Sequence, residues 1–190
     1  MIDKKHISTL RTYFLSHAEK RRDVIKLSED ALHHAKRAIF AIHRHDQGEA
    51  EKKLEEATML LKTVQKKYVK EKELLDEGAY KAALEEWVEA TLLHQFVTKG
   101  RIGSIATFVV PPEQYVAGLC DVPGELYRLA VQAATKKDMV MVKSCAEMGE
   151  EVIGALIEFN LTSYLRNKFD QAKQAVQKLE QIVYDMSIRS

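Results

Sequence analysis

Helix-breaking residues are rare in this chain. Proline occurs only at positions 111, 112 and 123, and only 8 of the 190 residues are glycine. Alanine, leucine, lysine and glutamate, which all favour helices, are abundant. Because proline and glycine interrupt helices and mark turns, their scarcity over so long a chain predicts an all-α protein.

Apolar residues recur at helical spacing along the chain. A first helix is expected to carry Ile7, Leu10 and Phe14 on one face, and a second, long helix to end at His45–Gly48. Five more are expected over residues 49–73, from about 76 to 97, from Pro111 onward, over 137–159 and over 165–186. The main break between them is 99–110. These stretches predict one domain, residues 1–190, folded as a bundle of about seven helices.

Charge and cysteine content narrow the class of protein. Lysine plus arginine (29) nearly balances aspartate plus glutamate (28), so total charge neither indicates nor excludes a polyanionic partner. Cys120 and Cys145 lie in apolar helical patterns and are expected to be core residues in a reducing compartment. No signal peptide is evident, and no apolar run approaches the ~20 residues of a membrane span. We expect a soluble, cytoplasmic protein without a membrane partner.

Four acidic residues lie in stretches that otherwise have the pattern of buried helices. Glu86 and Glu89 are three residues apart, and Asp121 and Glu125 are four apart, so each pair shares one helix face. The first pair falls on an otherwise apolar stripe: Ala82, Glu86, Glu89, Leu93 and Phe96. Two carboxylates therefore occupy positions where the helix pattern calls for apolar side chains.

A carboxylate at such a position needs a cation or another partner that offsets the free-energy cost of its burial. Burial of an ionised carboxylate without a partner costs several kcal/mol, and a divalent cation held by both pairs would remove that cost. Mg²⁺ prefers hard oxygen ligands, and no His or Cys lies near the acids at zinc-like spacing. The alternative is that these glutamates are ordinary surface charges.

A second cluster is basic. Only three acids, Asp23, Glu29 and Asp30, interrupt residues 20–45, where cationic side chains crowd the second helix. The residues predicted to follow a phosphate backbone are Arg22, Lys26, Lys36, Arg37, His43 and Arg44. The alternative is a solvated helix face without a ligand. Arg128 follows Glu125 by three residues and is expected to pair with it.

Three stretches, in order along the chain, resemble one family. The run Tyr115-Val-Ala-Gly-Leu-Cys-Asp-Val-Pro-Gly-Glu-Leu-Tyr-Arg-Leu resembles the signature Y-L-x-G-x-x-D-x-x-G-E-L-x-R of the translin/TRAX family. Lys178-Leu-Glu-Gln-Ile-Val-Tyr-Asp-Met-Ser-Ile-Arg is similar to that family's closing helix. Residues 26–30 and 36–44 are similar to its second helix.

The resemblance implies a fold and a function. The family is seven-helical, assembles into hollow octamers and binds single-stranded nucleic acid inside. Its TRAX type is a magnesium-dependent endoribonuclease, whose acids fall on Glu86, Glu89, Asp121 and Glu125; the translin type lacks acids at the fourth-helix positions. This chain resembles the catalytic type, although it lacks the TRAX tails and loop insertion. It also carries Pro123 between Asp121 and Glu125, which can kink the helix.

Three functional hypotheses follow. The first is a homo-oligomeric endoribonuclease, an octamer by resemblance, that cleaves single-stranded RNA with Mg²⁺, or Mn²⁺ in its place, held by the four acids. The second is a non-catalytic protein that binds single-stranded DNA or RNA. The third is an all-α nucleotide pyrophosphohydrolase, since Glu85-Glu86-Trp-Val-Glu89 fits an E-E-x-x-E motif, although the spacing of Asp121 and Glu125 argues against it. The absence of any Glu-x-x-His disfavours a di-iron bundle.

Overall fold

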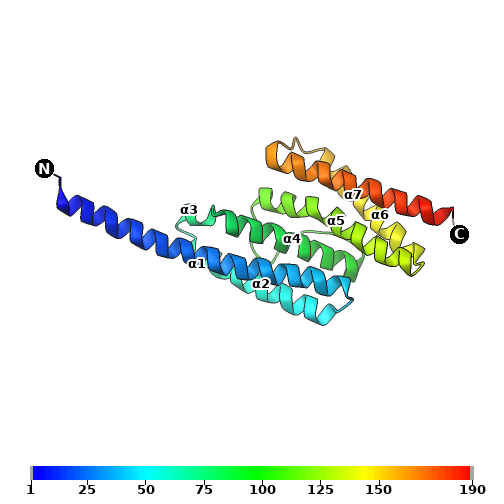
Figure 1. The fold of residues 1–190 in the computed structure, drawn as a ribbon, viewed down its shortest axis with the longest axis horizontal. Coiled ribbons are helices and arrows are strands. Elements are labelled where there is room, and N and C mark those ends of the chain that lie inside the picture. Colours follow the sequence, from blue (N-terminus) through cyan, green and yellow to red (C-terminus); the bar gives the residue numbers. More distant parts are fainter. Residues whose placement is uncertain (1, 189–190) are drawn as a thin grey trace.

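A computed structural model describes residues 2–188 and confirms the all-α prediction (Figure 1). These residues contain seven helices and no strand. The helices are α1 (Lys4–His43), α2 (Gln47–Tyr68), α3 (Lys72–Leu75), α4 (Gly78–Lys99), α5 (Pro112–Thr135), α6 (Met139–Ile157) and α7 (Ser163–Ser187). None of the helices within residues 2–188 is long and apolar enough to cross a membrane.

The first two expected helices are one continuous helix. α1 spans 40 residues and is capped at its start by the Asp3 carboxylate, which accepts hydrogen bonds from the backbone N–H groups of Lys5 and His6. No proline or glycine occurs between residues 4 and 43, so nothing in the sequence ends a helix there. The prediction of a break was wrong, and the short α3 accounts for the seventh helix.

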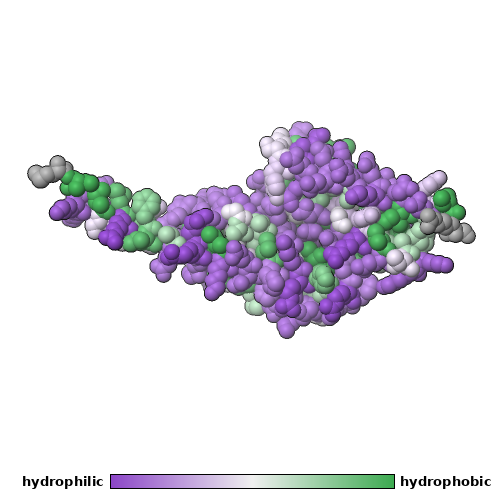
Figure 2. All heavy atoms as spheres, in the orientation of Figure 1, coloured by the Kyte–Doolittle hydropathy of each residue, from purple (hydrophilic) through white to green (hydrophobic). Residues whose placement is uncertain are grey.

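The N-terminal part of α1 extends beyond the rest of the molecule (Figure 1). Five large apolar side chains of this arm are exposed: Ile7, Leu10, Tyr13, Phe14 and Leu15. Figure 2 shows apolar surface, in green, beside hydrophilic surface on the projecting arm. A single chain therefore leaves a long apolar helix face in water, which favours association with another surface.

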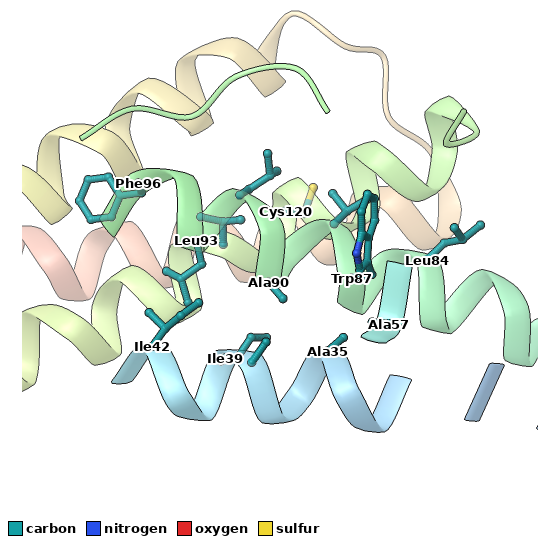
Figure 3. Close-up of a cluster of buried hydrophobic side chains, with 14 of the residues drawn as sticks. Ala35, Ile39, Ile42, Ala57, Leu84, Trp87, Ala90, Leu93, Phe96 and Cys120 are labelled. Carbon is teal, nitrogen blue, oxygen red and sulfur yellow. The ribbon is translucent and has the colours of Figure 1, made fainter. Parts of the chain in front are cut away.

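α4 occupies the centre of the bundle. It packs between α1 and α5, while α6 and α7 cover the far side of α5 (Figure 1). In Figure 3, Ala90 and Leu93 of α4 meet Ile39 and Ile42 of α1. Trp87 is buried, and its indole N–H donates to the Thr58 hydroxyl of α2 over 2.9 Å. The prediction that this helix is buried on several sides is confirmed.

α5 contains one proline in its first turn and a second in its interior, and neither ends the helix. Pro112 occupies its first turn, where a missing N–H costs no hydrogen bond. Pro123 lies inside the helix and is buried, yet α5 is helical on both sides of it up to Thr135. Cys120 of α5 and Cys145 of α6 are free thiols, and their burial raises the pKa of each to about 12. Both cysteines are core residues, as predicted.

Gly118 sets how closely α5 approaches α4. A methyl group at this position would lie 2.5 Å from the backbone oxygen of Glu85 and 2.8 Å from the Val88 Cβ. Contacts that short do not occur between real side chains, so α5 could not pack as it does with a larger residue here. The glycine lies one turn before Asp121 and faces the stretch of α4 that carries Glu86 and Glu89.

We predict that Gly118→Ala lowers the free energy of unfolding by roughly 1–3 kcal/mol, because the two helices must move apart. Gly124→Ala is the matched control. Gly124 lies in the same helix, and a methyl group added there would have nothing within 4 Å, so alanine should raise stability by up to about 1 kcal/mol. Urea titration of both variants measures the difference. Equal effects would mean that the close approach at Gly118 does not limit the packing of α4 on α5.

Candidate metal centre and nucleic-acid interface

The structure brings the four predicted acids together. Glu86 and Glu89 lie in the middle of α4, and Asp121 and Glu125 lie on the facing part of α5. They are close enough that the charges of Asp121 and Glu125 raise the pKa of both α4 acids. We call these four residues the acid cluster.

The two α4 acids are buried without a basic partner. Glu89 is only 8% exposed, and burial, followed by the charges of Asp121, Glu86 and Glu125, raises its pKa to about 9. Burial likewise raises the pKa of the half-buried Glu86. Within residues 2–188, neither side chain has an ion-pair partner within 4 Å. Glu89 is therefore protonated at neutral pH unless a cation replaces its proton.

Asp121 has a cationic partner that the sequence analysis missed. Lys168 of α7 donates a hydrogen bond to the Asp121 carboxylate, and its Nζ lies 3.5 Å from Oε2 of Glu85. The Tyr164 hydroxyl also donates to Glu85, over 2.6 Å. Burial outweighs the Lys168 hydrogen bond and charge, so the pKa of Asp121 is still raised. A signal was present, because Lys168 lies on the apolar stripe of α7, three residues after Leu165 and four before Ala172.

Glu125 is held by residues of α1 and α5. The side chain of His43 is buried and forms a hydrogen bond with the Glu125 carboxylate through Nε2. Nδ1 of His43 is also buried and has no hydrogen-bond partner among the described residues. Arg128 reaches Glu125 at 3.7 Å, which confirms their expected ion pair.

His43 is therefore not on the exposed basic face on which the sequence analysis grouped it. It follows Ile39 by four residues and is adjacent to Ile42, so helical geometry directs it inward with them. The five other predicted nucleic-acid-binding residues are exposed along α1 and at its C-cap: Arg22, Lys26, Lys36, Arg37 and Arg44. Arg37 is paired with Glu49 of α2 at 3.2 Å. Lys36 is close enough to the acid cluster that its charge lowers the pKa of Glu86 against the larger effect of burial.

The acid cluster offers only hard oxygen ligands. That chemistry suits a hard divalent cation such as Mg²⁺ or Mn²⁺. Within the described part of the chain, however, no three His, Cys, Asp or Glu side chains are already arranged around one point. These carboxylates would therefore have to move before three of them could share an ion, and the hydrogen bond of Asp121 with Lys168 would compete with such an ion.

Comparison with known proteins shows the family. The sequence matches the profile of the Translin family over residues 19–190. It is 35% identical to translin of Gallus gallus over 78 residues, which is 40% of this chain. That match spans about a third (34%) of the length of the chicken protein.

Solved structures share the fold along almost the whole chain. Apo-NeC3PO is 24% identical with a TM-score of 0.87, and the match covers 98% of both chains. A crystal structure of AfC3PO is 23% identical with a TM-score of 0.87, and the match covers 97% of this chain and 98% of that one. AfC3PO in complex with duplex RNA is 22% identical with a TM-score of 0.86, and 97% of each chain is covered.

The raised pKa of Glu89 predicts how stability depends on pH. Because the folded state holds this proton up to about pH 9 while the unfolded state releases it near 4.5, folding becomes less favourable as pH rises through that window. Glu89→Gln mimics the protonated acid and should be more stable than wild type by roughly 3 kcal/mol at pH 7 in EDTA. The two proteins should converge below pH 4.5.

Thermal unfolding at pH 5 and pH 8 measures this difference, with Glu150→Gln as the control. Glu150 is an exposed acid of α6, so its neutralisation should leave stability unchanged at both pH values. A Glu89→Gln variant less stable than wild type at pH 8 would mean that the carboxylate is ionised and stabilised in the folded protein.

Proposed function

Because the chain belongs to the Translin family, we propose that it binds single-stranded nucleic acid and cleaves single-stranded RNA as a magnesium-dependent endoribonuclease. The observation that carries the catalytic part is the acid cluster. Four carboxylates lie near one another where α4 faces α5, and two of them lack a cationic partner within residues 2–188. Such a site is costly for an empty protein but suited to a divalent cation.

The residues in and around the acid cluster would have different roles in the proposed reaction. Glu86, Glu89, Asp121 and Glu125 would hold Mg²⁺, or Mn²⁺ in its place. The metal would polarise a phosphate oxygen and lower the pKa of a bound water for in-line attack on phosphorus. His43 holds Glu125 in place through its hydrogen bond, whereas Lys168 occupies Asp121 and would have to release it for metal binding. Tyr164 and Lys168 together restrain the neighbouring Glu85.

Nucleic-acid binding is supported by the exposed cations of α1. Lys26, Lys36 and Arg44 are available to phosphates, while Arg37 would first have to leave Glu49. The structural relative AfC3PO has been solved with duplex RNA, so both single strands and duplexes are informative probes for this chain. Contacts between cations and phosphates carry no sequence information, so we expect little sequence specificity.

A non-catalytic, translin-type binding protein is the second candidate. It is favoured by the ion pair of Asp121 with Lys168 and by the absence, in the described residues, of three preplaced metal ligands. Membership of the Translin family counts against the nucleotide pyrophosphohydrolase. Cleavage of RNA by the purified protein in Mg²⁺, and its loss in EDTA, separates the two remaining functions.

We further propose that the chain assembles into a closed, hollow homo-oligomer, an octamer by analogy with its family. The exposed apolar arm of α1 supports this, since a second copy would remove Leu10, Phe14 and their neighbours from water. Light scattering should then give a mass several times 21.7 kDa. A monomer at micromolar concentration would contradict the assembly, and equal cleavage of duplex RNA would contradict the proposed preference for single strands.

Removal of one cluster acid should abolish cleavage without weakening binding. We expect Asp121→Asn to reduce cleavage of a labelled single-stranded RNA in Mg²⁺ at least 100-fold, because a metal ligand is lost. RNA affinity should stay equal or increase, since one charge that repels phosphate is removed. Glu150→Gln is the matched control. Cleavage by Asp121→Asn at the wild-type rate would exclude the acid cluster as the catalytic site.

Reversal of charge on α1 should weaken binding of every sequence alike. We expect Lys26→Glu with Arg44→Glu to lower affinity for single-stranded RNA and to flatten the dependence of affinity on salt concentration, because fewer counterions are released. The control is Lys143→Glu with Lys178→Glu, which changes exposed cations of α6 and α7. An unchanged salt dependence in the α1 variant would make its cations ordinary surface charges.

A further inference from the structure

Phe40 is an aromatic residue that the packing of a single chain does not explain. It lies in the last turn of α1 and is 56% exposed, although Ile39 and Ile42 beside it are buried. Its position is distinct from the apolar arm, which occupies the opposite end of α1 (Figure 1). An exposed aromatic ring offers a flat apolar face on which a ligand can stack, and the residues around the ring indicate which ligand it suits.

The ring lies directly beside the acid cluster. The guanidinium carbon of Arg128, on α5, is 5.6 Å from the centroid of the Phe40 ring, within the range of a cation–π contact. The same guanidinium reaches Glu125 at 3.7 Å. His43, three residues after Phe40, forms its hydrogen bond with that same carboxylate. One arginine thus links the exposed ring to the acids.

Cations flank the ring along the helix. Lys36 precedes Phe40 by four residues on the same face of α1, and Arg44, four residues after Phe40, is the C-cap residue of that helix. Both cations are exposed, and neither forms an ion pair within the described residues. A flat apolar ring between free cations, next to a guanidinium plane, matches the alternation of bases and phosphates in a flexible single strand.

We propose that Phe40 and Arg128 form a stacking platform for one nucleobase of a bound single strand, with Lys36 and Arg44 contacting the phosphates on either side. This inference rests on the proposed nucleic-acid binding and extends it by naming the group that sits beside the acid cluster. Because every base presents a flat π face, the platform accepts any sequence. Stacking there would also fix the neighbouring phosphate next to the acids.

The test measures RNA affinity in EDTA, where cleavage does not interfere. The probe is a fluorescein-labelled single-stranded RNA of mixed sequence, followed by fluorescence anisotropy. Phe40→Ala should weaken binding about tenfold, the change expected for the loss of one base–aromatic stack. Phe40→Trp should bind within about twofold of wild type, since it keeps a stacking surface. Phe159→Ala, which removes an exposed aromatic just beyond the end of α6, should bind like wild type.

A second strand separates stacking from charge. A labelled abasic strand of the same length keeps the phosphates but has no bases, so wild type and Phe40→Ala should bind it equally. The same loss for both strands, or no loss for either, would overturn the platform. Phe40→Ala must also keep the wild-type mass in light scattering. A change of mass would instead assign Phe40 to a contact between copies of the chain.

Failure of the wider proposal has its own signature. If wild-type protein binds neither strand nor duplex RNA, both the nucleic-acid function and the platform are wrong. If it binds RNA but does not cleave it in Mg²⁺, only the catalytic proposal falls, and the comparison of Phe40→Ala with Phe40→Trp still decides the platform.

Discussion

The close approach of α4 and α5 at Gly118 is the contact on which the candidate site depends. With no side chain at this position, the backbone of α5 packs directly against Glu85 and Val88 of α4. The acids lie immediately beyond this contact on both helices. Two pairs of carboxylates that each belong to one helix therefore become a single cluster. Hydrophobic packing elsewhere on α4 provides the free energy that holds the acids together despite their repulsion.

Only two of the four carboxylates in the acid cluster have a basic side chain as a partner, and this difference affects how the site would bind a cation. Asp121 and Glu125 have partners from outside α4, namely Lys168 and His43. Glu86 and Glu89 have none within residues 2–188, and burial raises the pKa of both, that of Glu89 to about 9. A cation that enters the site must displace a proton from Glu89 and compete with Lys168 for Asp121. Entry of a metal is thus coupled both to pH and to the position of α7.

The sequence predicted what depends on local geometry. The fold class, the burial of α4 and the pairing of acids on two helix faces all follow from spacing within one helix, and the family resemblance supplied the link between them. The continuity of α1 was predictable too, because no proline or glycine interrupts it. The partners of the acids were not, since Lys168 and Tyr164 reach the site only through the packing of α7 on α5. The proposed role of Phe40 also could not be predicted from the sequence, because it depends on the contact of its ring with Arg128 of α5.

The central claim is that the acid cluster is a divalent-cation site in which the metal replaces the Glu89 proton. Isothermal titration of the protein with Mn²⁺ at pH 7, in buffers of different ionisation enthalpy, measures the metal stoichiometry and the protons released together. We expect one saturable site per chain, with close to one proton released in wild type and almost none in Glu89→Gln. Binding without proton release, or no saturable binding in wild type, would contradict the claim.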